Sequence, residues 1–296
     1  MTSLPSDSYP SDSHPLSKDE SPSEEGLSTS EESGETSLAS HAEDVDLIST
    51  PSAHQMTEGE ICQILQHGEM DDIQMLPYSS NYNLLTLVTL DGMELTAVYK
   101  PQQGESPLWD FTSGTLCKRE VAAYVVSSAL GWSLIPPTIL RDGNYGIGSV
   151  QLYIEHDDSK HYFTVQEDER FASILRKLAL FDFITNNADR KSGHCLIDID
   201  GRLWAIDHGI CFHHEYKLRT VIWEFSGNPI EPEILNDLEL LRSVLDQPTN
   251  SYTASLSQLL SSSEQLAMVQ RLELLLESGT YPTPLPHRRN YPWPPV

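Results

Sequence analysis

The hydrophobic periodicity of this chain is mainly that of β-strands before about residue 154 and mainly that of helices after it, and this limits the folds that the chain can adopt. Before it, Asn83–Leu90 and Glu94–Tyr99 alternate apolar and polar side chains around Asp91-Gly92, a pair typical of a β-hairpin turn. After it, residues 170–186 and 231–246 repeat apolar side chains at helical spacing. This order predicts an α+β protein with a small β-rich lobe followed by a larger helical lobe.

Further elements are expected in both lobes. The β-rich lobe should contain helices over 58–67 and 116–130, each followed by a glycine, and a strand over 147–155. The helical lobe should contain a short hairpin that turns at Asp200-Gly201. A last helical run, over 254–277, should break near residues 261–263 and end at Gly279.

The first 55 residues differ from the rest in composition. They contain fifteen serines and twelve acidic residues against one lysine, with almost no large apolar side chains. Such a segment buries too little apolar surface to offset its chain entropy. We therefore expect a disordered acidic tail over 1–55, an N-lobe over 56–154, a helical C-lobe over 155–280 and an extended Pro-rich tail over 281–296.

The charge of the chain excludes some partners. The formal net charge is −26, and because residues 1–55 supply −11, the remainder carries −15. Nucleic acids and anionic membranes attract Lys/Arg patches, so neither is an expected partner. The sequence shows no signal peptide and no apolar stretch of roughly 18 residues. The four cysteines have no C-x-x-C spacing, so we expect a cytoplasmic protein with reduced thiols.

Two acidic residues flank the expected hairpin of the helical lobe. Asp189 lies in the polar run 186–194, and Asp207 follows an apolar strand and precedes His208-Gly209. In phosphoryl transfer, one carboxylate orients or deprotonates the nucleophile while another holds Mg²⁺. Arg190 and Lys191 would keep Asp189 ionised and attract phosphate. An acid such as Asp207 that follows apolar residues needs a partner or a cation.

A lysine and a glutamate in the β-rich lobe suggest a nucleotide site. Lys100 ends an apolar strand, and Glu120 lies in the next helix. Each alone is equally well explained as a solvated surface residue. Together they form the pair with which a kinase-like cleft holds nucleotide phosphates, the glutamate fixing the lysine.

Five segments together resemble a known family. They are A-V-Y-K-P (97–101), K-R-E-V-A-A-Y (118–124), G-S-V-Q-L-Y-I-E (148–155), N-N-A-D-R-K-S-G-H (186–194) and I-D-H-G (206–209). In order and spacing they resemble small bacterial (actinobacterial-type) members of the phosphatidylinositol 3-/4-kinase-like branch of the protein-kinase-like superfamily. The resemblance covers roughly residues 60 to 280 and implies a two-lobed protein-kinase-like fold.

The resemblance also implies a function and roles for individual residues. It implies an ATP-dependent phosphotransferase that uses Mg²⁺ or Mn²⁺ and moves the γ-phosphate to a protein or small-molecule hydroxyl. Asp189, with Arg190 and Lys191, would face that hydroxyl, and Asp207 would bind the metal. The connector residues Gln151, Leu152, Tyr153 and Ile154 would present their backbone to adenine. A Ser-containing loop at Ser79-Ser80-Asn81 would cover the phosphates.

Two departures from the family pattern leave alternatives open. His194 occupies the position where the superfamily usually has a metal-binding Asn, and imidazole suits Mn²⁺ or Zn²⁺ better than Mg²⁺. His208 replaces an apolar residue that often packs there. A weak or inactive nucleotide-binding regulatory module therefore remains possible, as do nucleotidyl transfer and a phosphohydrolase. The phosphohydrolase would use the site histidines, which are His194, His208, His213 and His214, together with Asp207.

The acceptor is not identified by the sequence. The segment after Asp207 contains His213, His214, Lys217 and Arg219, the densest group of cations in an acidic chain. If a phosphorylated or anionic acceptor docks on this chain, we expect it there; a solvated loop explains these residues equally well. Phosphoinositide lipids are not expected, because no basic or amphipathic surface for a bilayer is evident.

Overall fold

The computed structural model describes residues 56–76 and 81–296. The acidic tail expected over 1–55 lies outside the described residues, as do Ser79 and Ser80 of the expected phosphate loop. The described residues form one compact unit. Within the described residues, no helix is both long and apolar enough to cross a membrane.

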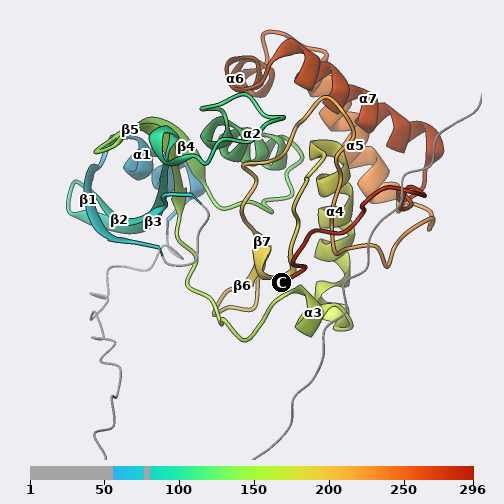
Figure 1. Ribbon diagram of the computed structural model, residues 1–296, viewed down its shortest axis with the longest axis horizontal. Helices are drawn as coiled ribbons and strands as arrows, with labels where there is room; N and C mark the ends of the chain where they lie inside the picture. Colours follow the sequence, from blue (N-terminus) through green and yellow to red (C-terminus); the bar gives the residue numbers. More distant parts are fainter. Residues whose placement is uncertain (1–55, 77–80) are drawn as a thin grey trace, which may run out of the picture. The chain divides into compact units, whose positions relative to one another are not determined.

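An antiparallel sheet of five strands, in the order β1-β2-β3-β5-β4, forms the N-terminal part of this unit (Figure 1). Its strands are β1 (Glu69–Met75), β2 (Leu84–Leu90), β3 (Met93–Pro101), β4 (Thr138–Gly143) and β5 (Gly146–Leu152). The hairpin predicted at Asp91-Gly92 is confirmed: Leu90 pairs with Met93, and both turn residues have positive φ. A type I′ turn requires this conformation, which an Asp-Gly pair adopts easily.

The sequence did not predict strands β1 and β4. These two strands are the edges of the sheet, so each pairs with a single neighbour. The β1 sequence is acidic, most of its side chains are exposed, and its register shifts between Asp72 and Gln74. Because an edge strand buries few side chains, it carries little of the alternation by which a strand is recognised.

The remaining elements are mostly helical. The helices are α1 (Glu58–His67), α2 (Leu116–Ala129), α3 (Tyr162–Val165), α4 (Glu169–Thr185), α5 (Pro232–Leu245), α6 (Ser251–Leu259) and α7 (Ser262–Ser278). A hairpin of β6 (Cys195–Ile197) and β7 (Leu203–Ala205) lies between α4 and α5, and two 3₁₀ turns are η2 (Gln102–Gly104) and η3 (Ser192–His194). The result is a sheet-containing N-lobe and a helical C-lobe, as predicted.

Local signals explain where several helices begin and end. Helix α1 begins with a capping box in which Thr57 and Glu60 satisfy each other's backbone amides. The break predicted near residues 261–263 separates α6 from α7, and Ser261 begins α7 with a second capping box. Helix α7 ends at Gly279 and α4 at Asn186, both in the left-handed conformation typical of a helix end.

Two apolar cores are connected by elements that contribute to both lobes. Helix α2 follows the first three strands of the sheet, yet Ala122 and Val126 belong to the same buried cluster as Leu175 of α4. Conversely, Leu196 of the β6–β7 hairpin packs in the cluster of the sheet. The lobe boundary expected at residues 154–155 stays a prediction.

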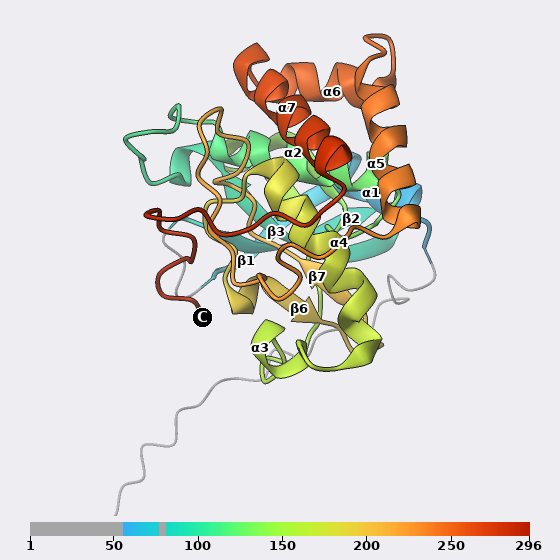
Figure 2. The same cartoon turned by 90° about the vertical axis from the view of Figure 1, so that its right-hand side faces the viewer.

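The C-terminal segment lies against the C-lobe. Tyr281 is buried, the carbonyl of Asn290 accepts from the Thr220 amide at 3.1 Å, and the Pro295 carbonyl accepts from the Ser192 amide at 2.9 Å. Figure 2 shows this segment, in dark red, crossing in front of α4 towards the β6–β7 hairpin. The last residues therefore brace the loop that contains Asp189 and the segment that follows Asp207.

All four cysteines are free. Burial raises the pKa of Cys117 and of Cys195 to about 12, so both thiols are protonated at neutral pH. This property makes them poor nucleophiles and poor metal ligands.

Gly148 should be intolerant of a side chain. A Cβ at this position would lie 2.5 Å from the carbonyl oxygen of Lys100 and 2.8 Å from Cα of Pro101. We expect Gly148→Ala to lower the free energy of unfolding by about 1–3 kcal/mol in urea titrations. Gly59→Ala, at an exposed and open helix position, should instead raise it by about 0.5–1 kcal/mol. Equal effects of the two substitutions would contradict the close approach of β3 and β5.

Candidate functional site

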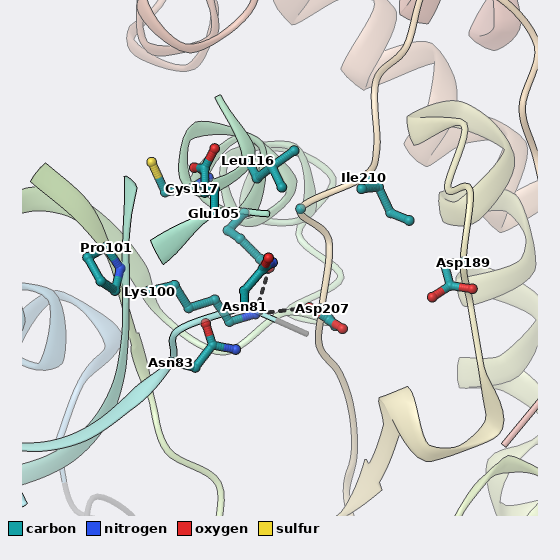
Figure 3. Close-up of a pocket in the computed structure, with 12 residues that line it drawn as sticks. Asn81, Asn83, Lys100, Pro101, Glu105, Leu116, Cys117, Asp189, Asp207 and Ile210 are labelled. Carbon is teal, nitrogen blue, oxygen red and sulfur yellow. Dashed lines mark hydrogen bonds and ion pairs between the residues drawn. The ribbon is translucent and has the colours of Figure 1, made fainter. Parts of the chain in front are cut away.

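Lys100 is the centre of the site. It lies near the end of β3, and its ammonium is 2.6 Å from Oε1 of Glu120 and 3.1 Å from Oδ1 of Asp207 (Figure 3). The three residues come from the sheet, from α2 and from the segment after β7. The sequence predicted the first pair; the contact with Asp207 joins residues that are more than one hundred positions apart.

Glu120 uses both of its carboxylate oxygens. It is buried on α2, and its second oxygen accepts from the backbone amide of His208 at 2.9 Å. Glu120 therefore fixes the Lys100 ammonium on one side and the chain that follows Asp207 on the other. A buried carboxylate is stabilised when both oxygens are paired in this way.

The charges of Lys100 and Asp207 depend on each other. Burial disfavours the Lys100 ammonium, but the carboxylates of Glu120 and Asp207 outweigh this effect and raise its pKa. The Lys100 ammonium holds the pKa of Asp207 well below its usual range. Both groups are therefore ionised at neutral pH.

The backbone of Asp207 is held in an unusual conformation. Its φ of 62° lies in the left-handed region, which favours glycine and typically costs a non-glycine residue about 1 kcal/mol or more. This conformation turns the chain sharply between Ile206 and Gly209. It also leaves the carboxylate half exposed, so one oxygen contacts Lys100 while the other faces His194.

His194 lies beside Asp207, with 3.4 Å between its Nε2 and Oδ2 of the carboxylate. Burial lowers the pKa of His194 to about 4, so the ring is neutral at neutral pH. Its Nδ1 accepts from the Lys191 amide at 3.4 Å, which assigns the proton to Nε2 and makes the ring a donor to Asp207. Metal ligation through Nε2 would require the other tautomer.

Asp189 lines the same pocket from the loop after α4. Its amide donates to Oδ1 of Asn187 at 2.9 Å, and the Lys191 ammonium lies 3.3 Å from its Oδ2. Burial raises the pKa of Asp189, and the positive charge of Lys191 opposes the rise. A carboxylate with a raised pKa accepts a proton more readily than a solvated one.

Arg190 does not lie where the sequence interpretation placed it. We grouped it with Asp189 and Lys191 as a residue that attracts phosphate, but its side chain is fully buried and does not line the pocket. Its guanidinium contacts Asp182 at 3.1 Å and donates to the carbonyl of Ile206 at 2.9 Å and to Nε2 of His208 at 2.5 Å. The geometry favours a positioning role.

Asp182, the acidic partner of Arg190, was not predicted from the sequence. It lies on the buried face of α4, where it accepts from Arg190, from Nδ2 of Asn187 at 3.0 Å and from Oγ1 of Thr220 at 3.0 Å. The available signal was a single acid inside the apolar run L-A-L-F-D-F-I (178–184). A buried acid of this kind requires a cationic partner.

The structure explains how His208 can replace the apolar residue that often packs at this position. The ring is buried, packs edge-on against Phe181 and accepts from Arg190. Burial and the neighbouring Arg190 charge hold the pKa of His208 well below its usual range. A neutral imidazole therefore fills the position of the expected apolar side chain.

The connector residues are not among those that line the pocket. Gln151 is buried and donates to Oγ1 of Thr138 at 2.8 Å, while Leu152 and Ile154 pack in the core of the sheet. The backbone amide of Tyr153 donates to Thr96 at 2.9 Å. Contact of these four residues with adenine stays a prediction.

The pocket is strongly acidic. Its charged lining consists of Lys100 and four carboxylates, from Glu105, Glu120, Asp189 and Asp207. Asn81 of the expected phosphate loop also lines it, as do Asn83, Pro101, Leu116, Cys117, Gly209 and Ile210. Glu105 was not predicted; its Oε1 accepts from the Cys117 amide at 2.8 Å and so caps the first turn of α2.

The histidines expected in a phosphohydrolase do not converge. His213 contacts the carbonyl of Asp110 through Nε2 at 2.8 Å and stacks on His214, whereas His208 is buried against Arg190. Among the described residues, no group of three or more His, Cys, Asp or Glu side chains is arranged to hold a metal ion. The geometry therefore gives no support to the phosphohydrolase alternative.

Removal of the Asp182 charge should destabilise the protein. In Asp182→Asn the Arg190 guanidinium keeps its burial but loses its counterion, which typically costs about 3–5 kcal/mol. We expect a loss of this size in the free energy of unfolding, measured with urea. The exposed Asp71→Asn should stay within about 0.5 kcal/mol of the unmodified chain. A loss below about 1 kcal/mol for Asp182→Asn would contradict the role of this ion pair.

The chain is similar to several known proteins. Residues 138–252 match the family described as phosphatidylinositol 3- and 4-kinase. Phosphatidylinositol 4-kinase gamma 4 of Oryza sativa subsp. japonica is 30% identical over a region that covers 38% of this chain and 23% of the rice protein. Because that region is a minor part of the rice protein, its name alone does not define the activity of this chain.

Two further matches extend over most of the chain. The structure of the Golgi casein kinase with Mn/ADP bound aligns with a TM-score of 0.53 at 18% identity, covering 77% of this chain and 76% of that one. This likeness shows a kinase-like fold. Protein Rv2133c of Mycobacterium tuberculosis is 37% identical over 78% of this chain and 94% of its own length. The chain therefore belongs with Rv2133c to a family of small phosphatidylinositol 3-/4-kinase-like proteins with a kinase fold.

Proposed function

We propose that this chain is an ATP-dependent phosphotransferase that moves the γ-phosphate of ATP to a hydroxyl group of a protein or small molecule. One observation carries the proposal. The Lys100 ammonium bridges Glu120 and Asp207 at 2.6 and 3.1 Å, and Asp189 lines the same pocket. Phosphoryl transfer needs a cation for the phosphates, a carboxylate for the metal and a carboxylate for the nucleophile.

The charge balance of the pocket supports the use of a divalent cation. Four carboxylates and one ammonium would repel a triphosphate. Mg²⁺ and Mn²⁺ fit, because such ions bind one or two protein carboxylates and complete their coordination with water and phosphate oxygens. Asp207 would hold the ion, as would His194 in its other tautomer. The ion would neutralise the charge on the transferred phosphoryl group.

The protein residues would bind the phosphates, orient the acceptor and accept its proton. Lys100 donates hydrogen bonds to the α- and β-phosphates, and Glu120 keeps its ammonium in place. Asp189 orients the acceptor hydroxyl and takes its proton as the oxygen attacks the γ-phosphorus. Arg190, from the core, fixes the loops that contain the two aspartates. These roles position the reactants, which is the main source of rate enhancement in phosphoryl transfer.

A second candidate is a nucleotide-binding regulatory module with weak or no turnover. The observation in its favour is the contact of His194 with Asp207. The Nε2 hydrogen of the ring faces Oδ2 of Asp207, so in this tautomer Nε2 has no lone pair for a metal ion. Such a module would bind ATP with a divalent ion but would not transfer phosphate. Turnover separates the two candidates.

The first test measures binding and turnover in two variants. We expect Asp189→Asn to lower γ-phosphate transfer by about 10²–10⁴-fold while thermal-shift titration shows nearly unchanged ATP binding. Asp207→Ala should remove the metal dependence of ATP binding. The exposed Asp71→Asn is the matched control and should change neither quantity. Full activity in Asp189→Asn would exclude it as the base, and ATP binding without transfer in the unmodified chain would favour the regulatory module.

The second test uses the pH dependence of turnover. The positive charge of Lys191 lowers the pKa of Asp189, although burial has the larger and opposite effect. Removing that charge in Lys191→Met should raise this pKa further. Because the base must be unprotonated, the acidic limb of the kcat/KM profile should move to higher pH. Lys160→Met, which removes a remote and half-exposed ammonium, should leave the limb in place. A shift to lower pH would contradict the assignment.

A further inference from the structure

Three arginines of the segments 206–231 and 281–296 form no ion pair with a carboxylate among the described residues. Lys191 and Lys217, in the same region, are paired with Asp189 at 3.3 Å and Asp110 at 2.8 Å. Arg219, Arg288 and Arg289 instead donate only to backbone carbonyls. We call these three residues the arginine rim.

Arg219 connects the arginine rim to the proposed base. Its Nη1 donates to the carbonyl of Ala188 at 3.4 Å, next to Asp189, and its backbone amide donates to Asn187 at 2.8 Å. Its Nε is buried and has no hydrogen-bond partner within the described residues. The positive charge of Arg219 also acts to lower the pKa of Asp189, so the guanidinium lies close to the position where the acceptor hydroxyl would bind.

The other two arginines extend the rim along the C-terminal segment. Arg288 is exposed, donates to the carbonyl of Tyr216 at 3.3 Å and lies over the Tyr216 ring. Arg289 is exposed as well, and the Asn290 carbonyl accepts from the Thr220 amide at 3.1 Å. The segment that contains Arg288 and Arg289 is thus hydrogen-bonded to the segment that contains Arg219, at Tyr216 and at Thr220.

We propose that the arginine rim binds the carboxylates of an acidic polypeptide and thereby selects it as the acceptor. The inference rests on the proposed function. Residues 56–296 carry about −15, so an acidic chain is repelled by most of the protein and attracted by these three cations, none of which forms an ion pair among the described residues. Cations on two neighbouring segments match several carboxylates along an extended peptide better than they match one small anion.

The proposed transfer involves the acceptor serine, ATP and Asp189. The hydroxyl oxygen of an acceptor serine forms a bond to the γ-phosphorus, and the bond between that phosphorus and the β,γ-bridging oxygen breaks. The serine proton passes to Asp189, and ADP leaves with the electron pair of the broken bond. The arginines take no part in these steps; they hold the peptide so that its serine reaches Asp189.

The sequence of this chain supplies a suitable probe. Residues 19–33, D-E-S-P-S-E-E-G-L-S-T-S-E-E-S, contain six acids and no cation. A synthetic peptide of this sequence tests the acidic acceptor class. A second peptide, with each Glu replaced by Gln and the Asp by Asn, keeps every hydroxyl and removes the charge. The ratio of their kcat/KM values, measured with full-length protein and γ-labelled ATP, reports charge selection alone.

We expect the acidic peptide to be preferred by about tenfold or more at low salt, and the preference to shrink as ionic strength rises from about 0.05 to about 0.5 M. Arg219→Gln, and separately the pair Arg288→Gln and Arg289→Gln, should lower the ratio while ATP binding is unchanged. Arg170→Gln, an exposed cation at the start of α4, is the matched control and should leave the ratio as it is.

Failure of this inference is distinguishable from failure of the proposed function. If the unmodified chain phosphorylates both peptides equally, prefers the uncharged one, or transfers phosphate only to a small molecule, the inference is wrong and the phosphotransferase stands. A ratio that the arginine substitutions leave unchanged also overturns the inference. If no γ-phosphate is transferred to any acceptor or to water, the proposed function fails, and the inference fails with it.

Discussion

The buried ion pair of Arg190 and Asp182 is the interaction on which the rest of the site depends. Arg190 extends from the loop that contains Asp189 into the core, where it also contacts the carbonyls of His194 and Ile206 and the ring of His208. One guanidinium thus fixes the two loops that carry Asp189 and Asp207. Burying such a pair is costly, and the cost is offset because the Arg190 guanidinium and both Asp182 oxygens make further hydrogen bonds. Its contribution is positional: it sets where Asp189 and Asp207 lie relative to each other.

The second organising contact joins the two lobes through Lys100. Its ammonium, from the sheet, contacts carboxylates on α2 and after β7, and Glu120 in turn accepts from the His208 amide. Because α2 also packs in the core of the C-lobe, this cluster of charges is supported by apolar burial on one side. The pocket remains acidic overall, and because of this charge, the proposed nucleotide chemistry would require a divalent cation.

Much of the fold was accessible from the sequence because the relevant signals are local. The hairpin at Asp91-Gly92, the long helices and the break before Ser261 each follow from a turn, a period or a cap within a few residues. Strands β1 and β4 lacked such a signal, since edge strands bury few side chains. Within the site, the pairing of Lys100 with Glu120 was predicted, whereas Asp182, Glu105 and the burial of Arg190 were not. The roles of the individual site residues remain predictions.

The loop 189–191 shows what could not be predicted from the sequence. The sequence by itself determined that this chain has a β-rich lobe, a helical lobe and two aspartates on either side of a hairpin, because periodicity and turn chemistry act over short distances. It did not determine which of three consecutive polar residues faces the pocket, because a loop has no period that assigns side chains to a core or to solvent. Only the tertiary structure decided that Arg190 points into the core, since its partner Asp182 is buried on a neighbouring helix.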